Sequence, residues 1–356
     1  MTDARLPVTL LTGFLGSGKT TLLNAWLKSP DLSEAAVIVN EFGDVGIDHE
    51  LIASSNDNTI ELSTGCLCCT VRGDLVDTLR ELIVKREKGE VRAFDRLIIE
   101  TTGLADPAPV IQAIMTFPVA RRFRLARVVT AIDAFNGAAT LGHHPEAVKQ
   151  AAVADEIIFT KVDLAPDAAA TLEAAVRAFN GGARYHVSSL QRMARAADLL
   201  SVDIYDPATK GEDVARWLNF GALEAGHDHA AGAHDGHHHH HDVNRHSADI
   251  SSFVFRFDEP LHWEHVANWL DALVIGHGPD LLRVKGILDI VGRERPVVVQ
   301  AVQSLFHPPF ELPSWPPGPR RSSIVFITRN LAQDFVAEVL ATIRKRSPVD
   351  HEGLRA

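Results

Sequence analysis

The cysteines of this chain lie in one short stretch. Residues 63–74 read STGCLCCTVRGD and contain all three cysteines of the 356 residues, Cys66, Cys68 and Cys69. Thiols clustered in a protein of the reducing cytosol are more often metal ligands or catalytic groups than disulfide partners, and an odd count leaves no closed disulfide framework. Three thiolates spaced C-x-C-C can converge on one soft divalent cation, and Gly65 allows the sharp turn that this requires. The stretch predicts a metal site, with small thiols packed in a core as the alternative.

The number of thiolates indicates how such a site would use its metal. A structural zinc site is normally closed by four protein ligands, whereas this stretch supplies three. One coordination position is left for a carboxylate, an imidazole, water or an incoming ligand. An open position suits a metal that the protein releases again.

A second motif predicts a phosphate-binding loop. Residues 13–20, GFLGSGKT, fit the pattern G-x-x-x-x-G-K-[ST], follow a strand-like run and lead into an amphipathic helix. The glycines let successive backbone N–H groups point at nucleotide phosphates at a helix N-terminus. Lys19 would act as a catalytic cation, and the Thr20 hydroxyl would be a ligand for Mg²⁺. The predicted cofactor-binding residues of this motif are Gly13, Gly16, Ser17, Gly18, Lys19, Thr20 and Thr21.

An acidic residue is expected at the end of another buried strand, where it would position the metal ion or a water. The run RLIIETTG, residues 96–103, places Glu100 there, and we predict it as the second catalytic residue. A glutamate that caps a helix is the alternative. Gly103 would offer a backbone N–H to the γ-phosphate and would let the following loop move when that phosphate leaves.

The base of the nucleotide is predicted from the stretch IIFTKVDL. It places Thr160, Lys161 and Asp163 just after a strand, in the pattern x-K-x-D. A carboxylate accepts hydrogen bonds from both N1–H and the exocyclic amine of guanine, whereas adenine presents an acceptor at N1. The predicted nucleotide is therefore GTP. Guanine-binding loops usually begin with Asn, whose amide contacts Thr160 cannot reproduce, and an ordinary strand end is the alternative.

Buried strands and helices alternate through the first 190 or so residues. Runs such as PVTLLT, AVIVN, RLIIE and DEIIFT are apolar at consecutive positions, which is typical of parallel strands covered on both faces. Leucines at helical spacing predict a helix that begins near Asp74 and ends before Gly89. The pattern predicts an α/β fold, a P-loop GTPase domain with a doubly wound, mainly parallel sheet.

The composition changes beyond about Pro207, and a second ordered region begins near residue 249. Its runs follow the order strand, helix, three strands, helix, which predicts a small α+β domain. The predicted division is residues 1–205 for the GTPase domain with the C-x-C-C motif, 206–248 for a linker with a His-rich loop, 249–345 for the C-terminal domain and 346–356 for a flexible tail.

The linker carries a histidine tract. Residues 226–246 contain nine of the chain's 18 histidines, among Gly, Ala and Asp. Imidazoles at such dense, irregular spacing can capture zinc, nickel or cobalt weakly and at several stoichiometries. The tract predicts a metal store near the cysteine site, with a solvated loop of no selected role as the alternative.

Composition narrows the class of protein. Hydrophobic residues make up 46% and charged residues 23%, as in ordinary globular proteins. The formal net charge of −11 argues against nucleic acid as a partner, because phosphate neutralisation requires a basic face. No apolar run is long enough to cross a membrane, and the N-terminus enters the first motif without a signal peptide. We expect a cytoplasmic protein without a membrane partner.

Five motifs in this order, GFLGSGKTTLLN, NEFGDVGID, GCLCC, ETTGLADP and TKVDL, resemble the CobW-like metallochaperone GTPases. The stretch from ISSFVFRFDEP to IVFITR also resembles the small C-terminal domain of that family, so the resemblance covers nearly the whole chain. It implies a GTPase that binds zinc or a related divalent metal and transfers it to a client apoprotein. The metal ligands that the resemblance implies are Cys66, Cys68 and Cys69, with Glu41 as the candidate fourth ligand.

Several interpretations stay open at this level. Soft thiolates favour zinc without excluding cobalt, so a cobalt chaperone for cobalamin synthesis is one alternative. Another is a passive zinc or cobalt buffer, in which the histidine tract and thiols store metal and the glycine loop has no role. A P-loop kinase is disfavoured because no second basic lid is visible. A homo-oligomer is possible in any of these.

Overall fold

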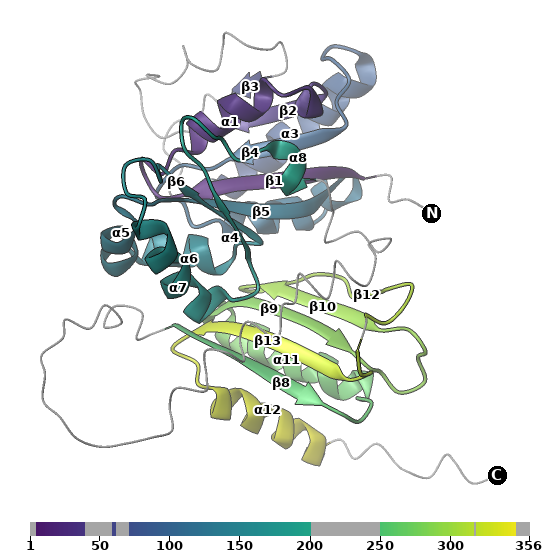
Figure 1. The fold of residues 1–356 in the computed structure, drawn as a ribbon. Helices are drawn as coiled ribbons and strands as arrows, with labels where there is room; N and C mark the ends of the chain where they lie inside the picture. The colour runs from purple at the N-terminus through teal and green to yellow at the C-terminus, as the bar shows by residue number, and fades with distance from the viewer. Residues whose placement is uncertain (1–4, 40–58, 62–70, 201–249, 317, 347–356) are drawn as a thin grey trace, which may run out of the picture. The chain divides into compact units, whose positions relative to one another are not determined.

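The computed structural model describes residues 5–39, 59–61, 71–200, 250–316 and 318–346. The chain divides into two compact units, Met1–Thr209 and Lys210–Ala356. Each unit has its own sheet, drawn in purple to teal for the first unit and in green to yellow for the second in Figure 1. Among the described residues, no helix is long and apolar enough to cross a membrane.

The first unit is built on a parallel sheet of seven strands in the order β3-β2-β4-β1-β5-β6-β7. The central strands are buried along most of their length because each of their faces is covered, which is why their sequences are apolar at consecutive positions. The strands are β1 (Leu6–Gly13), β2 (Ala35–Val39), β3 (Thr59–Glu61), β4 (Arg96–Glu100), β5 (Phe123–Asp133), β6 (Glu156–Thr160) and β7 (Arg184–Val187).

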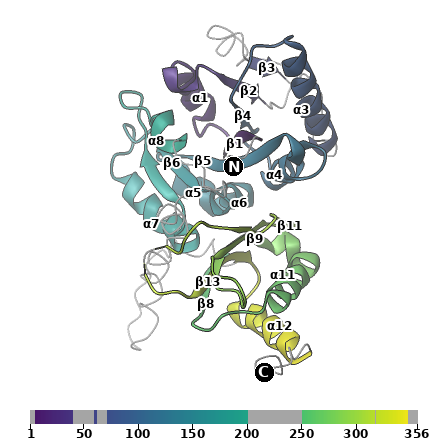
Figure 2. The ribbon, with the colours of Figure 1, turned by 90° about the vertical axis from the view of Figure 1, so that its right-hand side faces the viewer.

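Helices cover the two faces of this sheet. Figure 2 shows α1 and α8 on one side of it and α3 and α4 on the other. Trp26 of α1 anchors the first side, where its Nε1 donates to the carbonyl oxygen of Ala194 at 2.8 Å. The α3 helix begins at Val71, three residues earlier than the sequence predicts, and ends before Gly89 as predicted. The helices are α1 (Lys19–Leu27), α3 (Val71–Lys88), α4 (Ala108–Met115), α5 (Gly137–His143), α6 (Pro145–Ala152), α7 (Ala168–Asn180) and α8 (Ala196–Leu200).

The second unit has an antiparallel sheet with two helices. Its strand order is β11-β10-β9-β13-β8, and β12 pairs with β10. Trp269 is central to the core, packs near Phe255 and Phe326, and donates from Nε1 to the carbonyl oxygen of Val336 at 2.9 Å. The elements are β8 (Ile250–Phe257), α11 (Trp263–His277), β9 (Leu281–Leu288), β10 (Val297–Val302), β11 (Leu305–Phe306), β12 (Phe310–Glu311), β13 (Ser322–Arg329) and α12 (Gln333–Arg346). The predicted fold class, a doubly wound α/β unit and a small α+β unit, is confirmed.

Candidate nucleotide-binding site

The glycine loop lies between the end of β1 and the start of α1. Gly13 and Gly18 have φ angles of 142° and 86°, which side chains other than glycine rarely adopt. A Cβ atom on Gly13 would lie 2.3 Å from the carbonyl oxygen of Ala131 in β5, so the loop also requires glycine for space. Gly18 is the N-cap of α1. The unpaired N–H groups of the first turn of that helix therefore border the loop, which is the arrangement that binds phosphate.

Lys19 and Thr20 begin α1 next to a buried carboxylate. The Thr20 Oγ1 donates to Glu100 Oε1 at 2.8 Å, and Lys19 Nζ donates to the carbonyl oxygens of Gly13 and Phe14 at 2.9 and 3.2 Å. Lys19 is only 8% exposed. This burial lowers the pKa of the Lys19 ammonium, and the charge of Glu100 opposes the shift only in part. The structure thus brings both predicted catalytic residues to the predicted Mg²⁺ ligand.

The loop after β4, residues 101–107, which we call the Gly103 loop, packs directly on the glycine loop. A Cβ atom on Gly103 would lie 2.5 Å from the amide nitrogen of Leu15, so only glycine allows this approach. The Thr101 N–H donates to the carbonyl oxygen of Leu11, and its Oγ1 donates to Thr12 Oγ1 at 2.8 Å. The backbone of Gly103 is therefore held beside the place where the phosphates would lie.

The predicted base-binding residues lie after β6. Thr160 is buried, and its Oγ1 donates to the carbonyl oxygen of Ser17 at 2.7 Å. Lys161 has a left-handed φ of 56°, and its Nζ pairs with Asp133 Oδ2 at 2.9 Å. Asp163 is exposed, so its carboxylate is accessible to a ligand. Thr160 thus ties this loop to the glycine loop, a role that the sequence alone does not reveal.

Two residues of the site lie outside the sequence-based prediction. Asp133 ends β5 and accepts hydrogen bonds from Lys161, from the Asn136 side chain and from the Phe135 N–H. Burial alone would raise the pKa of Asp133, but these hydrogen bonds outweigh it and leave the pKa lowered. Gln150 of α6 donates to the Gly103 loop. A carboxylate at the end of a buried strand, the signal that identified Glu100, could have identified Asp133 as well.

The polar atoms around the loop fit a nucleotide with Mg²⁺. The hydroxyls of Ser17 and Thr102 are buried, and neither has a hydrogen-bond partner among the described residues. Buried polar groups are normally satisfied, so these hydroxyls indicate a polar ligand. Phosphate oxygens accept from such hydroxyls and from the Lys19 ammonium, while the oxygen donors Thr20 and Glu100 are of the type that Mg²⁺ prefers.

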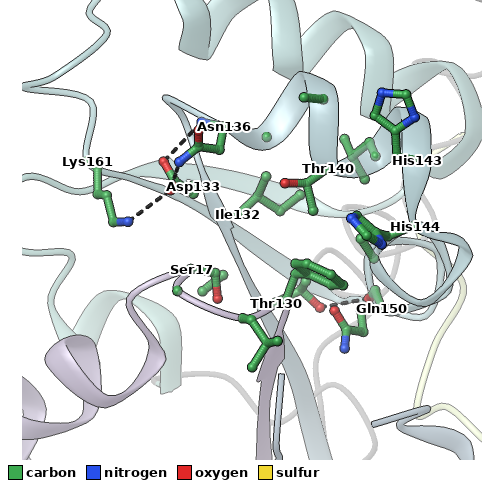
Figure 3. Close-up of a pocket in the computed structure, with 18 residues that line it drawn as sticks. Ser17, Thr130, Ile132, Asp133, Asn136, Thr140, His143, His144, Gln150 and Lys161 are labelled. Carbon is green, nitrogen blue, oxygen red and sulfur yellow. Dashed lines mark hydrogen bonds and ion pairs between the residues drawn. The ribbon is translucent and has the colours of Figure 1, made fainter. Parts of the chain in front are cut away.

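A cavity of about 380 Å³ adjoins the glycine loop (Figure 3). It lies between Phe14 and Ser17 of that loop, the end of β5, and the helices α5 and α6. The rings of Phe14 and His144 stack there with centroids 4.4 Å apart. The Asp133–Lys161 ion pair forms one wall, so the cavity separates this pair from Gln150.

The remaining predicted site residues are either exposed or outside the described residues. Thr21 is exposed in the first turn of α1. Among the residues that the structure describes, no group of three or more His, Cys, Asp or Glu side chains could hold a metal ion. The predicted metal ligands Glu41, Cys66, Cys68 and Cys69 lie outside the described residues, as does the histidine tract.

The sequence matches known families over both units. Residues 7–187 match the family described as CobW/HypB/UreG, nucleotide-binding domain, and residues 250–344 match the cobalamin synthesis protein cobW C-terminal domain. The zinc chaperone YjiA of Escherichia coli is 32% identical, over 96% of this chain and 99% of its own. The zinc chaperone CobW of Pseudomonas aeruginosa is also 32% identical, over 96% of this chain and 92% of its own.

A solved structure agrees with these matches. The crystal structure of the Zn(II)-bound YjiA GTPase from E. coli is 28% identical in sequence, covers 96% of this chain and 100% of its own, and superposes with a TM-score of 0.67. The resemblance seen in the motifs is confirmed by these comparisons. The chain belongs to the CobW/HypB/UreG family, with the nucleotide-binding domain of that family followed by a CobW C-terminal domain.

Proposed function

We propose that this protein hydrolyses GTP and couples its nucleotide state to the delivery of a divalent metal to a client apoprotein. Zinc is the metal that we expect. The observation that carries the GTPase part is the hydrogen bond between Thr20 and the buried Glu100 beside Lys19, at the end of a loop that requires glycine at position 13. The metal part is supported by relatives named as zinc chaperones that match this chain over nearly its whole length.

Each residue would have a distinct role toward the nucleotide. The backbone N–H groups of the glycine loop would bind the phosphates, and Lys19 would stabilise the negative charge that develops on the γ-phosphate. Thr20 would hold Mg²⁺, which supplies further charge neutralisation when bound. Glu100 would position the ion or a water through its contact with Thr20. The amide of Gly103 would meet the γ-phosphate.

The predicted metal ligands follow closely in sequence after strand residues that lie in register with Glu100. Val39, the last residue of β2, is the register partner of both Glu100 in β4 and Glu61 in β3. Glu41 comes two residues after Val39, and Cys66 comes five residues after Glu61. An extended chain spans at most about 3.6 Å per residue, which limits Cys66 to about 18 Å from Glu61. A metal at these ligands could therefore respond to the γ-phosphate, and the coupling would be reciprocal.

Isothermal titration of zinc tests this proposal. In the presence of Mg²⁺ and a GTP analogue that is not hydrolysed, we expect the affinity for one tightly bound zinc to differ from that in GDP by about fivefold or more, as coupling between sites typically gives. A passive metal buffer would bind zinc with the same affinity in both nucleotides. Equal affinities would therefore reject the coupling and leave the buffer as the function.

Asp163→Asn should change the preferred base. Guanine would lose its two hydrogen bonds to a carboxylate, so GTP binding should weaken by about 10- to 100-fold. Xanthosine triphosphate should bind better to this variant, because its base carries a carbonyl where guanine carries an amine and the Asn amide can donate to it. Competition between the two triphosphates, followed by fluorescence of a labelled nucleotide, measures the preference.

Asp167→Asn is the matched control for this substitution. Asp167 is exposed in the segment between β6 and α7, as Asp163 is, and the substitution removes the same charge. It should leave both affinities unchanged. Unaltered GTP affinity in Asp163→Asn would show that another residue reads the base.

A further inference from the structure

The side chain of Gln150 joins α6 to the Gly103 loop. It has no exposed surface, and its Nε2 donates to the carbonyl oxygens of Gly103 and Ala105 at 3.2 and 3.0 Å. The backbone carbonyl of Gln150 in turn accepts from Thr130 Oγ1 of β5 at 2.8 Å, which holds this turn of α6 on the sheet. Both protons of the amide are used on the loop, so the loop is fixed to a rigid element at two points.

The residue before Gln150 holds the same loop. Lys149 Nζ pairs with Asp106 Oδ2 at 2.9 Å, and Asp106 Oδ1 accepts from the N–H of Ala108 at the start of α4 at 3.0 Å. The Gly103 loop is therefore attached to α6 through two adjacent residues, one buried and one partly exposed.

The loop meets the glycine loop on its other side. The place of a Gly103 Cβ lies 2.5 Å from the Leu15 amide nitrogen, so the backbone of Gly103 packs directly against the glycine loop. The orientation of the Gln150 amide is fixed by chemistry, since only its nitrogen can donate to two carbonyl oxygens. Its Oε1 is buried without a hydrogen-bond partner among the described residues. Gln150 is also part of the cavity wall near His144 in Figure 3.

We propose that Gln150 is a positioning residue, which holds the Gly103 loop where its backbone N–H can meet the γ-phosphate and so sets the difference in affinity between GTP and GDP. This inference rests on the proposed GTPase function. GDP has no γ-phosphate, and its binding depends on the glycine loop, which Gln150 does not contact through a hydrogen bond. The effect of Gln150 should therefore fall on the triphosphate.

Gln150→Met tests the inference, because methionine keeps the length of the side chain and removes the amide. The affinity for a non-hydrolysed GTP analogue should fall about tenfold while the affinity for GDP changes by less than about twofold, since the two carbonyl oxygens that lose their donor both belong to the loop that meets the γ-phosphate. Titration with fluorescent GDP and with the fluorescent GTP analogue gives both dissociation constants for the chain of 356 residues.

Asn180→Leu is the matched control. Asn180 of α7 is 1% exposed, and its Nδ2 donates to the carbonyl oxygens of Ala151 and Ala154 at 2.8 and 3.0 Å. The substitution to leucine thus removes a buried amide that donates two hydrogen bonds, as Gln150→Met does. None of the atoms that Asn180 contacts belongs to the Gly103 loop. Its ratio of GDP to GTP-analogue dissociation constants should equal that of the wild type. A ratio shifted as far as in Gln150→Met would make the role of Gln150 purely structural and overturn the inference.

Lys149→Met provides a second variant that does not disturb the core. It removes the partly exposed ion pair with Asp106, and the ratio should shift in the same direction by about threefold, the size expected for one such pair. If Gln150→Met does not fold, this variant decides. If the wild type binds neither nucleotide, the proposed function itself fails. If the wild type binds both and neither variant shifts the ratio, only the role of Gln150 is rejected.

Discussion

GTP hydrolysis by Lys19→Ala should fall by about 10²- to 10³-fold, the loss that typically follows removal of one group that stabilises charge in a transition state. The Lys19 ammonium is held inside the glycine loop by the carbonyl oxygens of Gly13 and Phe14. Release of inorganic phosphate over time measures the rate. The fold should survive, because Lys19 is the first residue of α1 and alanine is a strong helix former.

Lys28→Ala is the control for this experiment. Lys28 is exposed at the C-cap of the same helix, so its removal changes the charge of α1 without reaching the loop. Circular dichroism and thermal melting should show that both variants are folded, and only Lys19→Ala should lose activity. A folded Lys19→Ala variant that still hydrolyses GTP at the wild-type rate would reject the glycine loop as the phosphate site.

Replacing Cys66, Cys68 and Cys69 together with serine should abolish one tightly bound metal. Metal binding by protein ligands contributes about 10–16 kcal/mol in zinc-finger peptides, so the loss of three thiolates should weaken the site by several orders of magnitude. Free cysteine thiols have a pKa of about 8.5 and must ionise to bind metal. Zinc binding to the wild type at neutral pH should therefore release protons, and binding to the serine variant should release fewer. Titration in two buffers of different ionisation enthalpy counts the protons.

Deletion of residues 227–241 should have the opposite effect. This segment contains eight histidines, which should bind additional metal ions weakly and lose them as the pH falls from about 7 to 5, because protonated imidazole cannot be a ligand. The deletion should remove the weak sites and leave one tight site whose affinity still depends on the nucleotide. If the serine variant keeps a tight, nucleotide-dependent metal, the cysteines do not bind the metal that is delivered to the client, and their clustering has another cause.

The local features of this protein are readable from its sequence. The glycine loop needs Gly13 and Gly18 for reasons of backbone conformation, and these depend on a few neighbouring residues. The central strands β1, β4 and β6 of the parallel sheet are recognised from runs of apolar residues, because each of their faces is covered. Periodicity also places the end of α3 before Gly89, but its start lies at Val71 rather than near Asp74, since the leucine spacing begins only at Leu75 and does not mark the turn before it.

The contacts between residues far apart in the sequence were decided by the tertiary structure alone. The Thr160 hydroxyl reaches the carbonyl oxygen of Ser17 across 143 positions of sequence, and Gln150 reaches Gly103 across 47. The Lys161 ammonium forms an ion pair with Asp133, which lies 28 positions earlier in the sequence. The motif pattern records residue types and spacing within one segment, whereas these contacts depend on the order of strands in the sheet and on which loops meet at its carboxyl edge. Local sequence thus predicts a phosphate loop and a base loop, and strand order determined which side chains tie these two segments together, because only the packed sheet brings their ends within hydrogen-bonding distance.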